Sequence, residues 1–423
     1  MESAMKYPSF RWFVMAAITV AYMGLGMVLI GFAPIVGMVA KEFHITVGQM
    51  SFYSMGIAVL TGALATIASG PLIDRFGLKP TLLVGIAITV IGALLVPVVT
   101  YSVAGLILLR IFGAIGTGPI GGCISAVAAR WFPYKQRGIF AGAVGGGISL
   151  GIAIGFIMMG AGLKAYNGDW RAAMLTLAIG PIVGLIMIVI MAIFGKEPRV
   201  HDVEVHRPGE KDRDFTLALR SPTIYVTIVC MFCLTWMMNA FNDLTPGYIA
   251  IPKPMGLGLG PAAAGTHMSA VQIGMILGAV FAGFIIDKVF KGNTKPVIFV
   301  GFVVAGLTML SVGYTFVHDS ARLFVACLFL AGFFEAFVIP CLTAFIAGNY
   351  PYTIVGKVFS LVMGIGIFGG SIGVSVGSGV LHFTSSYRLP IVIVAIVALV
   401  GVIATVFLNS AKAISEQEVA RSA

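Results

Sequence analysis

About twelve long apolar runs divide this chain of 423 residues, and they constrain its fold more than any other feature. A helix needs roughly 20 apolar residues to cross the hydrocarbon core of a bilayer. In that core the backbone N–H and C=O groups must pair within a helix or a closed barrel, and these runs lack the alternation of barrel strands. We therefore predict an all-α integral membrane protein with spans near 12–36, 50–73, 80–100, 104–128, 138–162, 171–195, 222–248, 262–286, 296–316, 320–348, 356–381 and 388–409.

Composition supports the membrane class, because 59% of the residues are hydrophobic and only 10% are charged. A soluble fold has no place for so much apolar surface. The first apolar run is long enough to span and no small-residue cleavage site ends it early, so we predict a permanent first helix. The five cysteines all lie within predicted spans, which indicates neither a disulfide framework nor a metal site.

The basic residues predict the orientation in the membrane. If the N-terminus is cytoplasmic, 19 of the 26 Lys and Arg residues lie on the cytoplasmic side, six lie outside, and Arg110 remains within a span. Because basic residues gather on the cytoplasmic side, we predict a multi-pass protein of the plasma (bacterial inner) membrane with both termini inside. The basic residues are scattered through short loops, so we expect no nucleic-acid partner.

One short loop occurs twice, about half the chain apart. In each copy a glycine closes an apolar run, adjacent acidic and basic residues follow, and a lysine precedes a proline that opens the next run. The residues of the two copies are Gly70, Asp74, Arg75, Gly77, Lys79 and Pro80, and then Gly283, Asp287, Lys288, Lys295 and Pro296. The repetition indicates two related halves.

The one long hydrophilic stretch, 196–221, separates six predicted spans from six. Its mixed charge and few large apolar residues predict a solvated cytoplasmic linker. We therefore expect an N-terminal six-helix bundle over 1–195 and a C-terminal six-helix bundle over 222–423. The linker is either a plain tether or a regulatory contact.

These features resemble the major facilitator superfamily, whose hallmark loop Gly-x-x-x-Asp-Arg/Lys-x-Gly-x-Arg/Lys matches Gly70 to Lys79. The resemblance covers the whole chain. It implies two pseudo-symmetric six-helix bundles, secondary transport by alternating access, and function as a monomer. It also implies gating roles, rather than substrate contact, for Asp74, Arg75, Gly77, Asp287 and Lys288.

Three charged residues stand well inside predicted spans, away from the ends, where a charge is costly and usually functional. Arg110 lies about two turns into its span and matches the family's arginine pattern, which implies proton coupling or binding of an anionic group. Glu335 has apolar and aromatic neighbours; because burial favours the neutral acid, it is the first candidate for a proton carrier. Asp243 is a second protonatable or gating group. Structural roles stay open for each: an ion pair, a stabilising glutamate and a helix-end cap.

The run that holds Asp243 also carries Asn239 and Asn242 on one face, by spacings of three and four. We predict that these amides bind substrate and that the helix breaks at Pro246, exposing backbone groups. Tyr22 is a further candidate for the substrate cavity. Gln272, in the next span, is a weaker one.

Glycines recur every four residues at two equivalent places, which predicts close helix contacts. The contacts either slide or pack statically. The residues are Gly147, Gly151 and Gly155 in the first half and Gly369, Gly373 and Gly377 in the second.

These observations predict proton-coupled uptake of a small, monocarboxylate-like organic anion; the second hypothesis is a proton-coupled antiporter that exports cationic or amphipathic compounds. The expected partners are a small-molecule substrate, protons and the lipid bilayer. We expect no enzymatic activity, cofactor or metal, because the sequence offers no nucleophile–base pairing, metal cluster or phosphate-binding loop in a solvated segment. A single intramembrane cation suits a monoanion better than a dianion.

Overall fold

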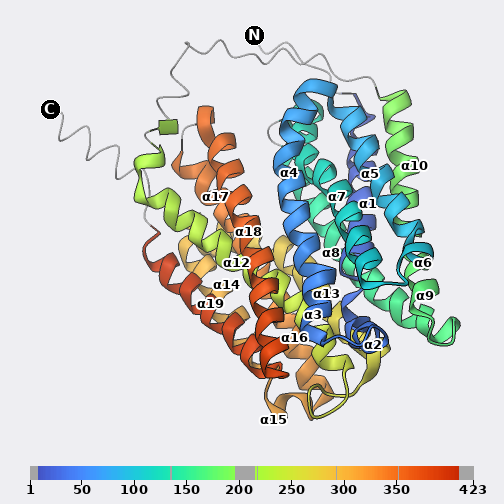
Figure 1. Cartoon of the computed structure of the whole chain (residues 1–423). Helices are drawn as coiled ribbons and strands as arrows, with labels where there is room; N and C mark the ends of the chain where they lie inside the picture. Colours follow the sequence, from blue (N-terminus) through green and yellow to red (C-terminus); the bar gives the residue numbers. More distant parts are fainter. Residues whose placement is uncertain are drawn as a thin grey trace, which may run out of the picture. The chain divides into compact units, whose positions relative to one another are not determined.

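The computed structural model describes residues 8–133, 136–195, 215–216, 218–291, 293–350 and 352–408. Within these ranges every regular element is a helix (Figure 1). The elements of the first half are α1 (Arg11–Ile30), the 3-10 turn η1 (Ala33–Ile35), α2 (Val36–Glu42), α3 (Val47–Ser51), the π-helical turn η2 (Phe52–Gly56), α4 (Ile57–Phe76), α5 (Leu78–Leu94), α6 (Val96–Val99), α7 (Val103–Trp131), α8 (Arg137–Ala165), α9 (Trp170–Thr176) and α10 (Ile179–Phe194). Those of the second half are α12 (Pro222–Ala250), α13 (Gly260–Phe284), the π-helical turn η4 (Ile285–Val289), α14 (Lys295–Ser311), α15 (Thr315–His318), α16 (Ala321–Glu335), α17 (Val338–Asn349), α18 (Tyr352–Thr384) and α19 (Arg388–Val406).

The helices confirm an all-α membrane protein. Ten helical stretches of the described chain are long and apolar enough to cross a membrane. Two shorter apolar helices, α5 and α14, stand at the third and ninth predicted spans and have 17 residues each. The count of twelve spans therefore stays a prediction.

Packing divides the described residues into two compact units. The first unit holds those within 1–201, 242–276 and 374–390, and the second holds those within 202–241, 277–373 and 391–423. Most of the predicted linker, 196–214 and 217, lies outside the described residues. The predicted boundaries of the two bundles are therefore still a prediction.

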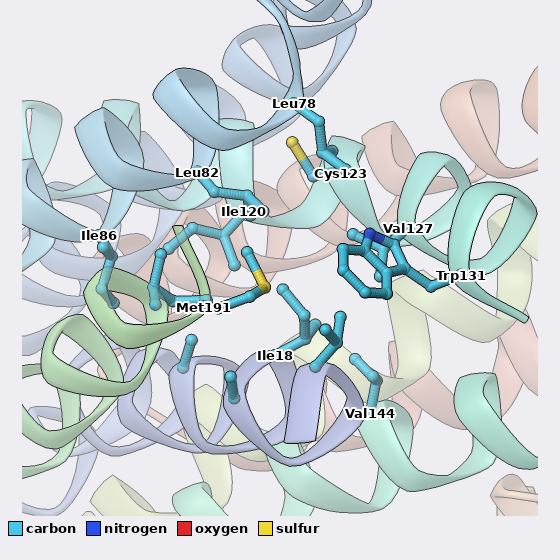
Figure 2. Close-up of a cluster of buried hydrophobic side chains, with 14 of the residues drawn as sticks. Ile18, Leu78, Leu82, Ile86, Ile120, Cys123, Val127, Trp131, Val144 and Met191 are labelled. Atoms are coloured by element: carbon cyan, nitrogen blue, oxygen red, sulfur yellow. The ribbon is translucent and has the colours of Figure 1, made fainter. Parts of the chain in front are cut away.

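The first unit is built around a buried apolar cluster (Figure 2). Leu78, Leu82 and Ile86 project from α5 toward Ile120 and Cys123 of α7, and side chains of α1, α8 and α10 complete the cluster. Since lipid is as apolar as these side chains, close packing rather than removal from water holds such helices together. The cluster fixes α7, the helix that carries Arg110.

The predicted glycine contacts bring helices together at backbone distance. Any side chain at Gly147, Gly151 or Gly155 of α8 would collide with α1, successively at Thr19, Met23 and Met27. In the second unit Gly369 and Gly373 of α18 meet Phe232 and Trp236 of α12 in the same way. The close approach is confirmed, whereas sliding along it stays a prediction.

The two copies of the repeated loop end on matching lysine contacts. Gly77, at a φ of 88° that favours glycine, joins α4 to α5. Lys79 Nζ then donates to the carbonyls of Ala192 (3.0 Å) and Gly195 (2.5 Å) at the end of α10. In the second copy Lys295 Nζ donates to the carbonyl of Val406, the last residue of α19, at 2.6 Å. Each half thus ties the start of one helix to the end of its last one.

The predicted helix break at Pro246 is wrong, because α12 continues through this proline to Ala250. Only one turn follows Pro246, so few backbone bonds depend on it. A break occurs instead between α16 and α17, at Ala336 and Phe337. Pro340 lacks the N–H that would pair with the carbonyl of Ala336, and its ring clashes there. Glu335 therefore lies at a break, not in an unbroken helix.

Candidate functional site

Arg110 lies two turns into α7, as predicted, and its guanidinium binds main-chain carbonyls. Nε donates to Ser54 at 2.5 Å, Nη2 to Leu29 at 2.7 Å and Nη1 more weakly to Val28 at 3.4 Å. These acceptors belong to α1 and to the turn η2. Three of the five N–H donors of the arginine are thereby used, and the other two have no hydrogen-bond partner among the residues that the structure describes.

The cavity beside Arg110 is mainly apolar. Its wall includes three threonines, Thr89, Thr100 and Thr117, and each hydroxyl donates to a carbonyl three or four residues earlier, at 2.7 to 3.1 Å. Among the described residues, Arg110 is the one charged group in the wall. The cavity therefore offers an anion one positive group and few other polar contacts.

Asp243 is 3% exposed and ends a chain of hydroxyl groups. Ser51 Oγ donates to Asp243 Oδ2, and it lies 2.7 Å from Ser378 Oγ. The charge of Arg110 also acts on Asp243, although no ion pair joins the two in the described chain. Asp243 is thus brought near Arg110, but its direct contacts are serines that the sequence analysis missed.

Tight contacts between α3 and the end of α18 surround this hydroxyl chain, and we call them the α3–α18 seam. A side chain at Gly48 would collide with the carbonyl of Ser378 and the N–H of His382. Thr46 Oγ1 lies 2.7 Å from His382 Nδ1, and it also caps α3 in a capping box with Gln49. The Thr-x-x-Gln spacing was the one signal of this segment that the sequence displayed.

Asn242 pairs with Gln272 rather than with Asn239. Gln272 Nε2 donates to Asn242 Oδ1 at 2.6 Å, and Gln272 and Asn242 are 0% and 2% exposed. Gln272 Oε1 has no hydrogen-bond partner within the described chain. Asn239 lies in the second unit, where its Nδ2 donates to the carbonyl of Thr235 in the same helix at 2.9 Å. The predicted polar face of α12 is therefore divided between two environments.

Glu335 belongs to the second unit and is 1% exposed. Neither carboxyl oxygen has a hydrogen-bond partner among the residues that the structure describes. The neighbouring Phe333, Phe334 and Phe337 pack their rings against one another with centroids 5.1 to 5.3 Å apart. Holding a charged carboxylate in such a place is costly, whereas a neutral acid is tolerated.

The other predicted site residues lie apart from these groups. Tyr22 of α1 is half-buried against the apolar cluster, and its hydroxyl faces Gly121 of α7. Asp74 and Arg75 are exposed at the end of α4, and Lys288 is exposed in η4. The side chain of Asp287 lies outside the described part of the structure.

Comparison with known proteins gives matches along nearly the whole chain. The family description "Major Facilitator Superfamily" matches residues 14–256 and 248–422. A hexuronate transporter of Bacillus subtilis is 27% identical over 208 residues, which cover 47% of this chain and 46% of that protein. The multidrug transporter AQR1 of Candida glabrata is 32% identical over 173 residues, which cover 40% of this chain and 28% of that protein. The matched regions thus span less than half of these two relatives.

One solved structure shares the fold along the chain. It is the crystal structure of a bacterial homolog of the human lysosomal transporter Spinster, in an inward-facing and unoccupied conformation. The two chains superpose with a TM-score of 0.73 over 95% of this chain and 98% of the other, at 14% sequence identity. At this identity the likeness concerns the fold alone.

Proposed function

This chain belongs to the Major Facilitator Superfamily, and from that premise we propose that it couples the uptake of a small organic monoanion to protons. It is a multi-pass membrane transport protein and not an enzyme. Alternating access moves the cargo in this proposal. Two six-helix bundles, 1–195 and 222–423, are joined by the linker 196–221, and a monomer is the working unit. Both termini lie on the cytoplasmic side of a bacterial inner membrane.

The observation that carries the proposal is the buried, unpartnered carboxyl group of Glu335 in the described chain. An acid held without donors or cations is stable only in its neutral form, so it retains a proton until water reaches it. Exposure to opposite sides in turn would make it a carrier. Its position beside the break between α16 and α17 supports this role, because irregular backbone at membrane depth commonly lines a cavity.

Asp243 and Arg110 serve as the second titrating group and the anion-attracting group in this mechanism. Arg110 keeps two N–H donors after binding three carbonyls, and a guanidinium is permanently charged. The negative charge of Asp243 offsets it when no anion is bound, so arrival of an anion and protonation of Asp243 favour each other. Asn242, Asn239 and Tyr22 complete the proposed substrate contacts.

Gating is assigned to the repeated loops and to the α3–α18 seam. The seam must part for the site to reach the other side of the membrane. The loop residues Asp74, Arg75, Gly77, Asp287 and Lys288 then bias the two conformations. A proton or a ligand can shift such an equilibrium only by interacting differently with its two states.

The test is uptake into proteoliposomes under an imposed pH gradient, with a panel of labelled monocarboxylates. We expect accumulation against the substrate gradient when the outside is acidic. Glu335→Gln should abolish this accumulation and keep exchange of substrate at equal pH on both sides. Asp319→Asn is the matched control, because this acid is 70% exposed at the surface of the second unit. Uphill uptake that persists in Glu335→Gln contradicts the carrier role.

A second candidate is proton-coupled export of cationic or amphipathic compounds. Similarity to the multidrug transporter AQR1 favours it, as do two buried acids that could attract a cation. A thermal-shift screen of the purified protein separates the two, because a ligand that binds the folded state stabilises it. Stabilisation by monocarboxylates that is lost in Arg110→Ala supports uptake of anions; stabilisation only by cations, lost in Glu335→Gln, supports export.

A further inference from the structure

We propose that Gln272, held in place by Asn242, reads a hydroxyl group of the substrate and so selects hydroxylated monoanions over their deoxy analogues. The inference rests on the proposed function and narrows its substrate class. Gln272 was only a weak candidate from the sequence, and the proposal gives it the specificity role.

The geometry begins with an incomplete pair of amides. Gln272 of α13 donates to Asn242 Oδ1 at 2.6 Å, yet its own Oε1 is buried without a partner in the described chain. Exchanging the O and N positions of both amides would keep their mutual bond but leave the amino group of Gln272 unpaired instead. In either orientation one half of the Gln272 amide lacks a partner within the described residues. A buried group of this kind requires an explanation, and binding of a ligand supplies one.

The chemistry of the unpaired group determines what it can recognise. With Nε2 engaged by Asn242, the group left to bind is a carbonyl oxygen, which accepts from an O–H or N–H donor. A carboxylate is an acceptor and repels this oxygen, so a different part of the anion must approach it. An alcohol group on the body of the anion supplies the donor. Asn242 is the positioning residue, because in the orientation found here its bond to Nε2 leaves Oε1 as the end of Gln272 that a ligand can reach.

Other polar groups near Asn242 and Arg110 already have partners, which explains why Gln272 is the residue that binds the hydroxyl group of the substrate. Asp243, the next residue after Asn242, is occupied by Ser51, and Ser51 is in turn bonded to Ser378. The threonines beside Arg110 donate their hydroxyl hydrogens to carbonyls of their own helices, so they have no hydrogen left to donate to a substrate. Gln272 is 0% exposed here. Access to it therefore requires a conformational change, which the proposed alternating access provides.

The test compares two three-carbon acids that differ by one hydroxyl group, lactate and propionate. Their dissociation constants are measured by thermal shift on the full-length protein in detergent, so that membrane permeation of the free acids does not interfere. The wild type should bind lactate about tenfold more tightly, the effect of one hydrogen bond. Gln272→Met, of similar length but without an acceptor oxygen, should bring the ratio of the two constants near one.

Two further variants separate recognition from folding. In Gln272→Glu the buried neutral acid can donate its O–H to Asn242 and keep a carbonyl acceptor, so this variant should retain a preference for lactate. Asn349→Met removes a half-buried amide that donates to the carbonyl of Phe345 in its own helix, and it should leave the ratio unchanged. If the role of Gln272 were purely structural, Gln272→Met would weaken the binding of both acids equally.

The outcomes distinguish the two levels of the proposal. If both acids bind and Gln272→Met leaves their ratio as in the wild type, the hydroxyl inference is wrong and anion transport survives. If neither acid binds the wild type while cations do, the proposed function itself fails, and the inference fails with it.

Discussion

Glu335 and Asp243 are equally buried, at 1% and 3% exposure, but only Asp243 has a hydrogen-bond donor in the described chain. A serine hydroxyl donates to Asp243, and the charge of Arg110 acts on it as well. Glu335 has neither within the described residues, and its near neighbours in sequence include Phe333, Phe334 and Phe337. Burial by itself therefore does not define the role of an intramembrane acid. Its partners determine how readily it takes up and releases a proton.

The largest expected effect is a difference between Glu335 and Asp243 in how far each is needed for proton-driven accumulation of the substrate. Glu335→Gln should eliminate proton-driven accumulation, whereas Asp243→Asn should reduce the initial uptake rate by about tenfold, as expected for weakening one charged hydrogen bond. The amide introduced at this position can still bond to Ser51, so some coupling survives. The measurements are the initial uptake rate and the accumulation ratio at a fixed pH gradient. If Asp243→Asn removes more accumulation than Glu335→Gln, the comparison of the two acids is reversed.

A smaller effect is expected when the donor to Asp243 is removed. Ser51→Ala leaves a buried carboxylate without its hydroxyl, which should lower stability by about 1–3 kcal/mol. Ser378→Ala is the matched control, because Ser51 can still donate to Asp243 without it. Thermal unfolding of the purified variants measures the difference. Equal melting temperatures for the two variants would show that Ser51 does not stabilise the charge of Asp243.

The smallest effect concerns a third, exposed acid. Asp74→Asn should lower the maximal transport rate by severalfold and change the KM little, because the proposed role of this loop is to bias conformations rather than bind substrate. The comparison with Glu335→Gln then contrasts an exposed gating acid with a buried proton carrier. Initial-rate kinetics in proteoliposomes check it. Unchanged kinetics would remove Asp74 from the gating assignment.

The sequence predicted the helices well because hydrophobicity acts over whole segments. Every predicted span contains a helix of the structure, and the depth of Arg110 in α7 was correct. Single prolines were harder to interpret. Pro246 and Pro340 both remove a backbone donor, yet only the second accompanies a break, because its place along the helix and its packing decide the outcome.

The candidate site was less predictable, since its contacts join distant positions. Ser51 and Ser378 are 327 residues apart, and no local pattern distinguishes them from other serines in apolar runs. The partners of Arg110 are main-chain carbonyls, which every residue has. Charge in an apolar segment identified Arg110, Asp243 and Glu335, but the sequence does not contain the list of their neighbours.

The matching contacts of Lys79 and Lys295 give the duplicated loop a mechanical purpose besides gating. Each lysine, at the start of one helix, donates hydrogen bonds to main-chain carbonyls at the end of another. In each half a cation therefore connects two helix ends. Helix ends that are connected in this way resist separation when the protein changes conformation. Helix movement would then be confined to the glycine contacts of α8 with α1 and of α18 with α12, where no lysine makes such a bond in the described residues.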